Sequence, residues 1–186
     1  MMYDKEIIVR RFYAGEKMQF LFFWGHTAKP GEIGKACLSQ WYGCEFEVDG
    51  VKYHTTEQYM MAQKALLFND QDNYEKIMSA DNPRDYKALG RKICNFKEDI
   101  WNRHKYEIVL KGNLAKFSQN SELKEFLLGT GESVLAEASP YDRIWGIGLA
   151  MDNSDIQNPD HWKGENLLGF ALMETRFFLK KGQNER

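Results

Sequence analysis

The spacing of hydrophobic and polar residues predicts a chain that is helical over most of its length. The apolar run at 19–24 predicts a buried strand. Apolar and polar residues alternate over 45–53, on both sides of Asp49-Gly50, and this pattern is a strong signal for a β-hairpin. Helices are expected over 57–68, where Thr55 or Thr56 caps the start, and over 71–80, 84–92, 98–118, 121–128 and 163–180.

The segments between these elements predict loops. Residues 25–43 hold four glycines and a proline, and residues 130–162 are dense in Gly, Pro, Asp and Asn. Long loops inside a compact domain are uncommon and often functional. Residues 1–18 predict either a short strand at 7–9 or a loose leader. The sum is an α+β fold, predominantly helical, with a small antiparallel sheet.

Length and composition are those of one ordinary globular domain. The chain has 186 residues, of which 43% are hydrophobic and 28% charged, and this excludes a disordered or collagen-like chain. We expect a single domain over 19–180, an N-terminal segment at 1–18 and a tail at 181–186. Since no apolar run approaches the roughly 20 residues of a membrane span, we expect a cytoplasmic protein without a membrane partner.

Charge, cysteines and aromatic residues narrow the chemistry. A net charge of -2 argues against broad nonspecific binding to nucleic acid, but it leaves room for a local basic pocket. The three cysteines form no CxxC and the four histidines lack ligand spacing, so we expect no metal and no other cofactor. The aromatic content of 14% includes five tryptophans, which build cores and also stack on bases.

One candidate segment is the predicted helix that begins near Thr56. Helical spacing places Glu57, Met60, Met61 and Lys64 on one face. One interpretation is a surface glutamate with a lysine whose stem lies along the apolar face. The other is a pocket carboxylate and a desolvated amine, whose lowered pKa would suit a nucleophile.

The second candidate segment is the irregular stretch over 130–148. It holds the acids Glu137 and Asp142, Trp145, and the glycines Gly146 and Gly148, at which backbone can approach a ligand closely. Alternatively the stretch is only a structural loop, in which Asp142 accepts local N–H groups and Trp145 fills the core.

Short blocks in a fixed order make the chain resemble a known family, the YbiA-like N-glycosidases, also called NADAR domains. The resemblance covers about 20–179, and the ordered set is far more specific than any one block. The blocks are Phe23-Trp24-Gly25-His26, Leu38-Ser39-Gln40-Trp41-Tyr42, Asp49-Gly50 with Tyr53, Thr56-Glu57-Gln58 with Ala62 and Lys64-Ala65, Lys87 with Gly90-Arg91, Trp101 with Arg103, Lys116-Phe117, Leu128 with Thr130-Gly131, and Leu135-x-Glu137-Ala138-Ser139-Pro140-x-Asp142-x-x-Trp145-Gly146-x-Gly148.

The resemblance implies hydrolysis of an N-glycosidic bond. One branch of the family cleaves phosphoribosylamino-pyrimidine intermediates of riboflavin synthesis. Another removes ADP-ribose from guanine in DNA or nucleotides, and can act as antitoxin to a guanine-modifying ADP-ribosyltransferase. Gln40-Trp41 stands where the first branch usually has Asn-Phe, so the sequence looks more like the ADP-ribose branch.

The resemblance also implies the site residues. As catalytic residues it suggests Glu57 and Asp142, and Lys64 matches a family lysine. The matching blocks suggest seven residues that bind the substrate: Trp24, Gly25, His26, Trp101, Arg103, Trp145 and Gly146. Trp101 and Trp145 would stack on the base, and Arg103 or Arg91 would hold phosphate.

One mechanism serves both substrate classes, because each joins ribose C1′ to an exocyclic amino nitrogen. A neutral Lys64 amine would attack C1′, expel the base amine and hold the sugar as a Schiff base, with Glu57 and Asp142 as acid and base. The competing route is direct hydrolysis by a carboxylate pair without a covalent step. A module that only binds ADP-ribose or nucleotide, and a purely structural protein, are the alternatives that are not enzymes.

Overall fold

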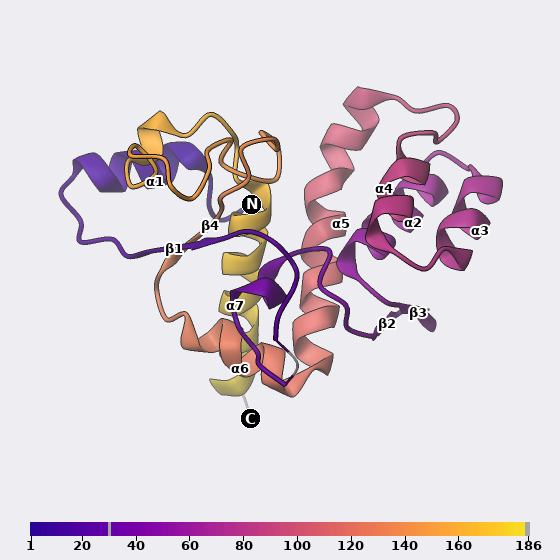
Figure 1. The fold of residues 1–186 in the computed structure, drawn as a ribbon, viewed down its shortest axis with the longest axis horizontal. Helices are drawn as coiled ribbons and strands as arrows, with labels where there is room; N and C mark the ends of the chain where they lie inside the picture. The colour runs from indigo at the N-terminus through magenta and orange to yellow at the C-terminus, as the bar shows by residue number, and fades with distance from the viewer. Residues whose placement is uncertain (30, 185–186) are drawn as a thin grey trace. The chain divides into compact units, whose positions relative to one another are not determined.

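The protein is described by a computed structural model over residues 1–29 and 31–184, and its chain divides into two compact units. The first unit is formed by Met1–Ser39 and Ser121–Arg186, and the second by Gln40–Asn120 (Figure 1).

The second unit consists of a hairpin and four helices. Strands β2 (Phe46–Val48) and β3 (Val51–Tyr53) pair antiparallel, with Phe46 opposite Tyr53. Asp49 and Gly50 both have positive φ, 53° and 79°, as a two-residue hairpin turn with the right twist requires. The helices are α2 (Thr56–Leu67), α3 (Gln71–Ser79), α4 (Pro83–Gly90) and α5 (Glu98–Gln119).

Helix α2 is the centre of this unit and packs against α3, α4 and α5 (Figure 1). The Thr55 side chain accepts the amide of Gln58 and so caps its start. One glycine on each of two neighbouring helices, α4 and α5, lets that helix approach α2 closely. A Cβ at Gly90 would lie 1.9 Å from the Met61 sulfur, and a Cβ at Gly112 would lie 2.6 Å from the Tyr59 ring.

The first unit is built around a parallel pair of strands. Strand β1 (Phe20–Phe23) pairs with β4 (Val134–Glu137), and α7 (Leu167–Asn184) packs on β4 (Figure 1). A Cβ at Gly169 of α7 would lie 2.1 Å from the Leu135 carbonyl oxygen, so this contact requires glycine. The unit also contains α1 (Lys5–Tyr13), α6 (Ser121–Gly129) and the 3-10 turns η1 (Lys35–Leu38) and η2 (Pro159–His161).

The side chain of Asn166 joins the strand pair to the start of α7. Its amide nitrogen donates to the Leu135 carbonyl at 2.9 Å, and its oxygen accepts from the Glu137 amide at 3.1 Å. Asn166 is fully buried, so both halves of its amide are used inside the protein.

The predominantly helical α+β class, the hairpin, the strand near 19–24 and all six predicted helices are confirmed, with helix ends shifted by a few residues. The strand predicted at 7–9 is wrong, because these residues lie in α1, which Asp4 caps by accepting the amide of Ile7 at 2.7 Å. Strand β4 lies inside the predicted loop 130–162. The protein therefore has a parallel pair of strands in addition to the expected antiparallel pair. Helix α7 runs to Asn184, into the predicted tail, and 185–186 lie outside the described residues.

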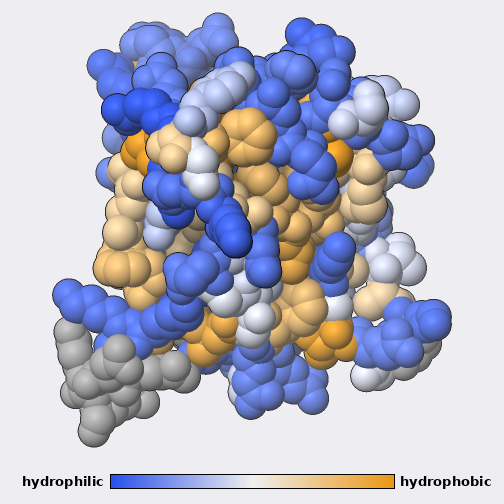
Figure 2. All heavy atoms as spheres, turned by 90° about the vertical axis from the view of Figure 1, so that its left-hand side faces the viewer, coloured by the Kyte–Doolittle hydropathy of each residue, from blue (hydrophilic) through white to orange (hydrophobic). Residues whose placement is uncertain are grey.

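Among the described residues, no helix is both long enough and apolar enough to cross a membrane. On the face shown in Figure 2, hydrophobic surface is visible between hydrophilic side chains.

Candidate active site

Glu57 lies in the first turn of α2, and its side chain is buried, with 3% exposure. Its amide donates to the Gln40 carbonyl at 2.9 Å, and the Thr56 hydroxyl donates to the same oxygen at 3.2 Å. The start of α2 is therefore fixed to the segment before the hairpin. The interpretation of Glu57 as a surface residue is wrong.

The Lys64 amine is half-buried at the other end of α2. Its Nζ donates to the Gly90 carbonyl at 2.8 Å, and it lies 4.3 Å from the centre of the Phe96 ring and 5.5 Å from that of Trp101. Burial lowers the pKa of the Lys64 amine, because it removes water from the charged form. The carbonyl and the ring faces attract the charged form, so the amine is held in one place.

The two methionines of the predicted stripe are buried in the unit. Met61 packs against Gly90, and the Gln40 amide contacts the Met60 sulfur at 3.7 Å. They form apolar surroundings on the face that carries Glu57 and Lys64, as the helical spacing predicted.

Trp101 and Arg103, both predicted to bind substrate, lie in the first turns of α5 and differ in their surroundings. Trp101 is half-buried and contacts Lys64, so the structure brings these two predicted residues together. Arg103 is exposed and pairs with Asp99 one turn earlier, at 3.1 Å. An exposed pair of this kind costs little to open, so the guanidinium remains available to a phosphate.

Phe96 is a residue of this cluster that the sequence did not indicate. It lies between α4 and α5, is partly exposed, and packs edge-on against Phe68 with ring centres 5.3 Å apart. It belongs to none of the family blocks and to no predicted element. Only its contact with the Lys64 amine identifies it.

In the first unit, two segments predicted to belong to the site begin at the carboxyl ends of the paired strands. Trp24, Gly25 and His26 follow β1, and the loop after residue 137 follows β4, which runs parallel to β1. The Ala138 amide donates to the Phe23 carbonyl at 2.8 Å and keeps the two segments adjacent. Trp24 is 55% exposed, and Gly25 has a φ of 84° that favours glycine. Ligands commonly bind beyond the carboxyl ends of parallel strands.

Asp142 organises the loop after β4. Its Oδ1 accepts the amides of Ile144 at 3.0 Å and Trp145 at 2.8 Å. A Cβ at Gly146 would lie 2.9 Å from the Glu137 carbonyl oxygen, so the backbone here is tightly packed. Trp145 is half-buried, so it does not simply fill the core. These are the local hydrogen bonds expected if Asp142 holds the loop in shape. Both are accepted by Oδ1, so they leave the second carboxylate oxygen, Oδ2, available for catalysis.

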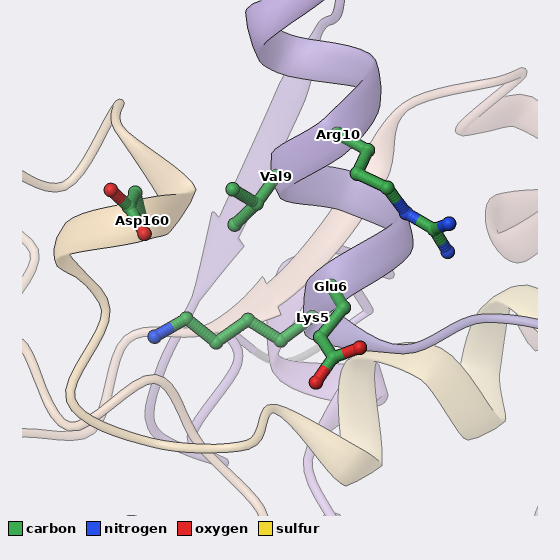
Figure 3. A pocket seen from close by; sticks show the side chains of 5 residues that line it. All are labelled: Lys5, Glu6, Val9, Arg10 and Asp160. Carbon is green, nitrogen blue, oxygen red and sulfur yellow. The ribbon is translucent and has the colours of Figure 1, made fainter.

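A separate cavity of about 510 Å³ lies in the first unit and contains none of the predicted site residues (Figure 3). It is lined by Lys5, Glu6, Val9, Arg10 and Asp160. The Lys5 side chain extends toward the segment of Asp160, whereas Arg10 points away (Figure 3). Within the described part of the chain, no three His, Cys, Asp or Glu side chains gather as the ligands of one metal ion would.

Comparisons with known proteins identify relatives over most of the chain. The model of the NADAR domain matches residues 22–180. N-glycosidase R617 of Acanthamoeba polyphaga mimivirus is 43% identical over 166 residues, which are 87% of this chain and 96% of the relative. N-glycosidase YbiA of Escherichia coli is 34% identical over 130 residues, which are 70% of this chain and 72% of YbiA.

A solved structure has the same fold. The NMR structure of E. coli YbiA matches with a TM-score of 0.74 and 28% identity, and the match covers 92% of this chain and 90% of YbiA. The matched region includes both compact units.

Proposed function

The chain belongs to the NADAR domain family and is an N-glycosidase, and we propose that it removes ADP-ribose from ADP-ribosylated guanine in DNA or nucleotides. The bond cleaved would join ribose C1′ to the exocyclic amino nitrogen of guanine. The observation that carries this proposal is the Lys64 amine, held by the Gly90 carbonyl against two aromatic rings, on the same helix as the buried Glu57. Such a pair suits a reaction that passes through an imine.

The preference for ADP-ribose rests on the segment before the hairpin. Trp41 stands where riboflavin-linked members usually have phenylalanine, and the Lys87 amine lies 5.9 Å from its ring centre. An indole beside a cation suits a large substrate with a second base and a diphosphate. A phosphoribosylamino-pyrimidine has neither.

The proposed reaction proceeds through Lys64. Opening of the ribose ring turns the C1′–N linkage into an imine, to which the neutral Lys64 amine adds. Guanine leaves as the free amine after its nitrogen accepts a proton, and the sugar remains bound to Lys64 as a Schiff base. Water then adds to C1′, the lysine nitrogen leaves, and the ring closes to give ADP-ribose.

Glu57 and Asp142 are the proposed proton donors and acceptors. One carboxyl group must protonate the ring oxygen or the leaving nitrogen, and the other must accept a proton from water. Trp101 and Trp145 are proposed to stack on bases, and Arg103 to bind phosphate. Trp24, Gly25, His26 and Gly146 complete the proposed substrate-binding set.

The deciding experiment offers the protein two substrates and follows both products by mass spectrometry. One is a single-stranded oligonucleotide with ADP-ribosylated guanine, and the other is a phosphoribosylamino-pyrimidine. We expect release of ADP-ribose with restored guanine, and little cleavage of the pyrimidine. The reverse preference would assign the protein to the riboflavin-linked branch. The biological partner implied by the expected result is an ADP-ribosyltransferase toxin that modifies guanine.

A further inference from the structure

Tyr141 presents its ring to solvent from a well-fixed loop. Of the large hydrophobic side chains that the structure describes, it is the most exposed, at 89%. The loop around it is not loose, because Asp142 accepts two amides and the Ile147 amide donates to the Glu137 carbonyl at 2.9 Å. A single exposed aromatic residue is common and carries no meaning alone. The surroundings of this one are unusual.

Two cations lie together on this loop and the segment packed against it: Arg143 follows Tyr141 by two residues, and Lys163 lies beside Arg143. A Cβ at Gly148 would lie 3.0 Å from Cβ of Lys163 and 3.2 Å from Cγ of Arg143. The bases of the two side chains are therefore close to each other. The Lys163 amide donates to the Ile147 carbonyl at 2.8 Å, which fixes the two segments against each other. Both cations are exposed, and neither forms an ion pair within residues 1–29 and 31–184. The exposed Glu165 is the nearest acid along the second segment.

We propose that Tyr141, Arg143 and Lys163 bind the nucleotide next to the modified guanine in a single strand. This inference rests on the proposed function. The ring would stack on the flanking base, and the two cations would contact its phosphates. An aromatic face with adjacent cations is how proteins hold single-stranded nucleic acid without reading its sequence. The chain as a whole has a net charge of -2, so an anionic nucleic-acid strand is not attracted to the protein in general. It would bind at this local basic surface.

The first test compares two substrates that share the reacting bond. One is ADP-ribosylated guanosine monophosphate, and the other is ADP-ribosylated guanine within a single-stranded oligonucleotide. Tyr141→Ala should lower kcat/KM on the oligonucleotide by roughly 5- to 100-fold, the effect of losing one stacked base, and leave the mononucleotide within about twofold. Tyr13→Ala is the matched control, because Tyr13 is 64% exposed in the same unit but lies on α1. Equal losses on both substrates, or no loss on either, would overturn the proposal.

The second test does not depend on catalysis. Binding of an unmodified, fluorescently labelled oligonucleotide is followed by anisotropy at several salt concentrations. Wild type and Tyr13→Ala should bind alike and Tyr141→Ala more weakly. Arg143→Ala and Lys163→Ala should each reduce the salt slope by roughly 0.7, the value for one neutralised phosphate on a single strand.

The two tests separate the inference from the proposed function. If the wild type releases ADP-ribose from neither substrate, the proposed function fails and the anisotropy decides the inference. Weaker binding by Tyr141→Ala would then still support the surface. Equal binding by Tyr13→Ala and Tyr141→Ala would refute it.

Discussion

The Lys64 amine lies 4.3 Å from the centre of the Phe96 ring, close enough for the ring to stabilise its positive charge. This attraction opposes burial, which lowers the pKa of the same amine. The balance matters because a lysine must lose its proton before it can attack C1′. Phe96 is therefore expected to influence the reaction through the charge of Lys64.

Phe96→Leu should shift the acidic limb of the pH–rate profile to lower pH. The change keeps an apolar side chain but removes the ring, which at a partly exposed site is worth about 0.5–1 kcal/mol to the charged amine. The pKa of Lys64 should then fall further, because the ring no longer stabilises the charged amine. The measurement is kcat/KM against pH, with Phe177→Leu on α7 as an exposed control. An acidic limb that does not shift would show that the pH–rate profile does not reflect the ionisation of Lys64.

Lys64→Arg should abolish turnover while the protein still binds ADP-ribose. Arginine keeps a positive charge but cannot form the Schiff base. Borohydride added during turnover of the wild type should trap a sugar adduct, and peptide mass spectrometry should map it to Lys64. Near-normal activity of Lys64→Arg without an adduct would contradict the covalent route. Direct hydrolysis by the carboxyl groups would then be favoured.

The elements that could be predicted from the sequence are those with local signals. The Asp49-Gly50 turn needs only two residues with positive φ, and the Thr55 cap needs only one side chain and one amide. The same locality explains why the spacing of Glu57 and Lys64 on α2 was predicted correctly.

The elements that were missed depend on partners far away in the sequence. Strand β4 has four residues and pairs with β1, more than a hundred positions earlier. The β-branched run at 7–9 favours a strand, but the Asp4 cap and the complete burial of Ile8 favour α1. Phe96 was missed for the same reason, since only folding brings it to Lys64.

Glu57→Gln and Asp142→Asn should each lower kcat by roughly 100-fold or more if these groups transfer protons. Both changes keep the shape of the side chain. Asparagine at 142 also keeps the oxygen that accepts the amides of Ile144 and Trp145, so the loop should remain folded. The measurement pairs kcat with thermal unfolding. A variant of Asp142 that loses stability along with activity would support a purely structural role.

Gly169→Ala should destabilise the first unit by about 1–3 kcal/mol or more. The added Cβ would lie 2.1 Å from the Leu135 carbonyl oxygen, and a backbone atom of β4 cannot move aside as a flexible side chain could. Gly182→Ala is the control in the same helix, because no atom lies within 4 Å of its added Cβ. Denaturant unfolding should show a loss for the first variant and a small gain for the second.

Asp70 should make the stability of the protein depend on pH in the acid range. Its carboxylate accepts the Asn73 amide at 3.1 Å, the Asn73 side chain at 2.7 Å and the Cys94 amide at 2.7 Å. These hydrogen bonds lower the pKa of Asp70 to about 2, led by the one from the Asn73 side chain.

An unfolded aspartate has a pKa of about 3.9, so the folded state favours the charged form. The stabilisation is therefore complete above about pH 5 and is lost as the pH falls through about 4 toward 2. Asp70→Asn should unfold more easily than the wild type at pH 7, and the difference should shrink steadily below pH 4. Asp72→Asn, an exposed acid on the same helix, should show no such convergence. A gap between wild type and Asp70→Asn that stays constant from pH 7 to pH 3 would mean that the charge of Asp70 does not hold the Cys94 segment in place.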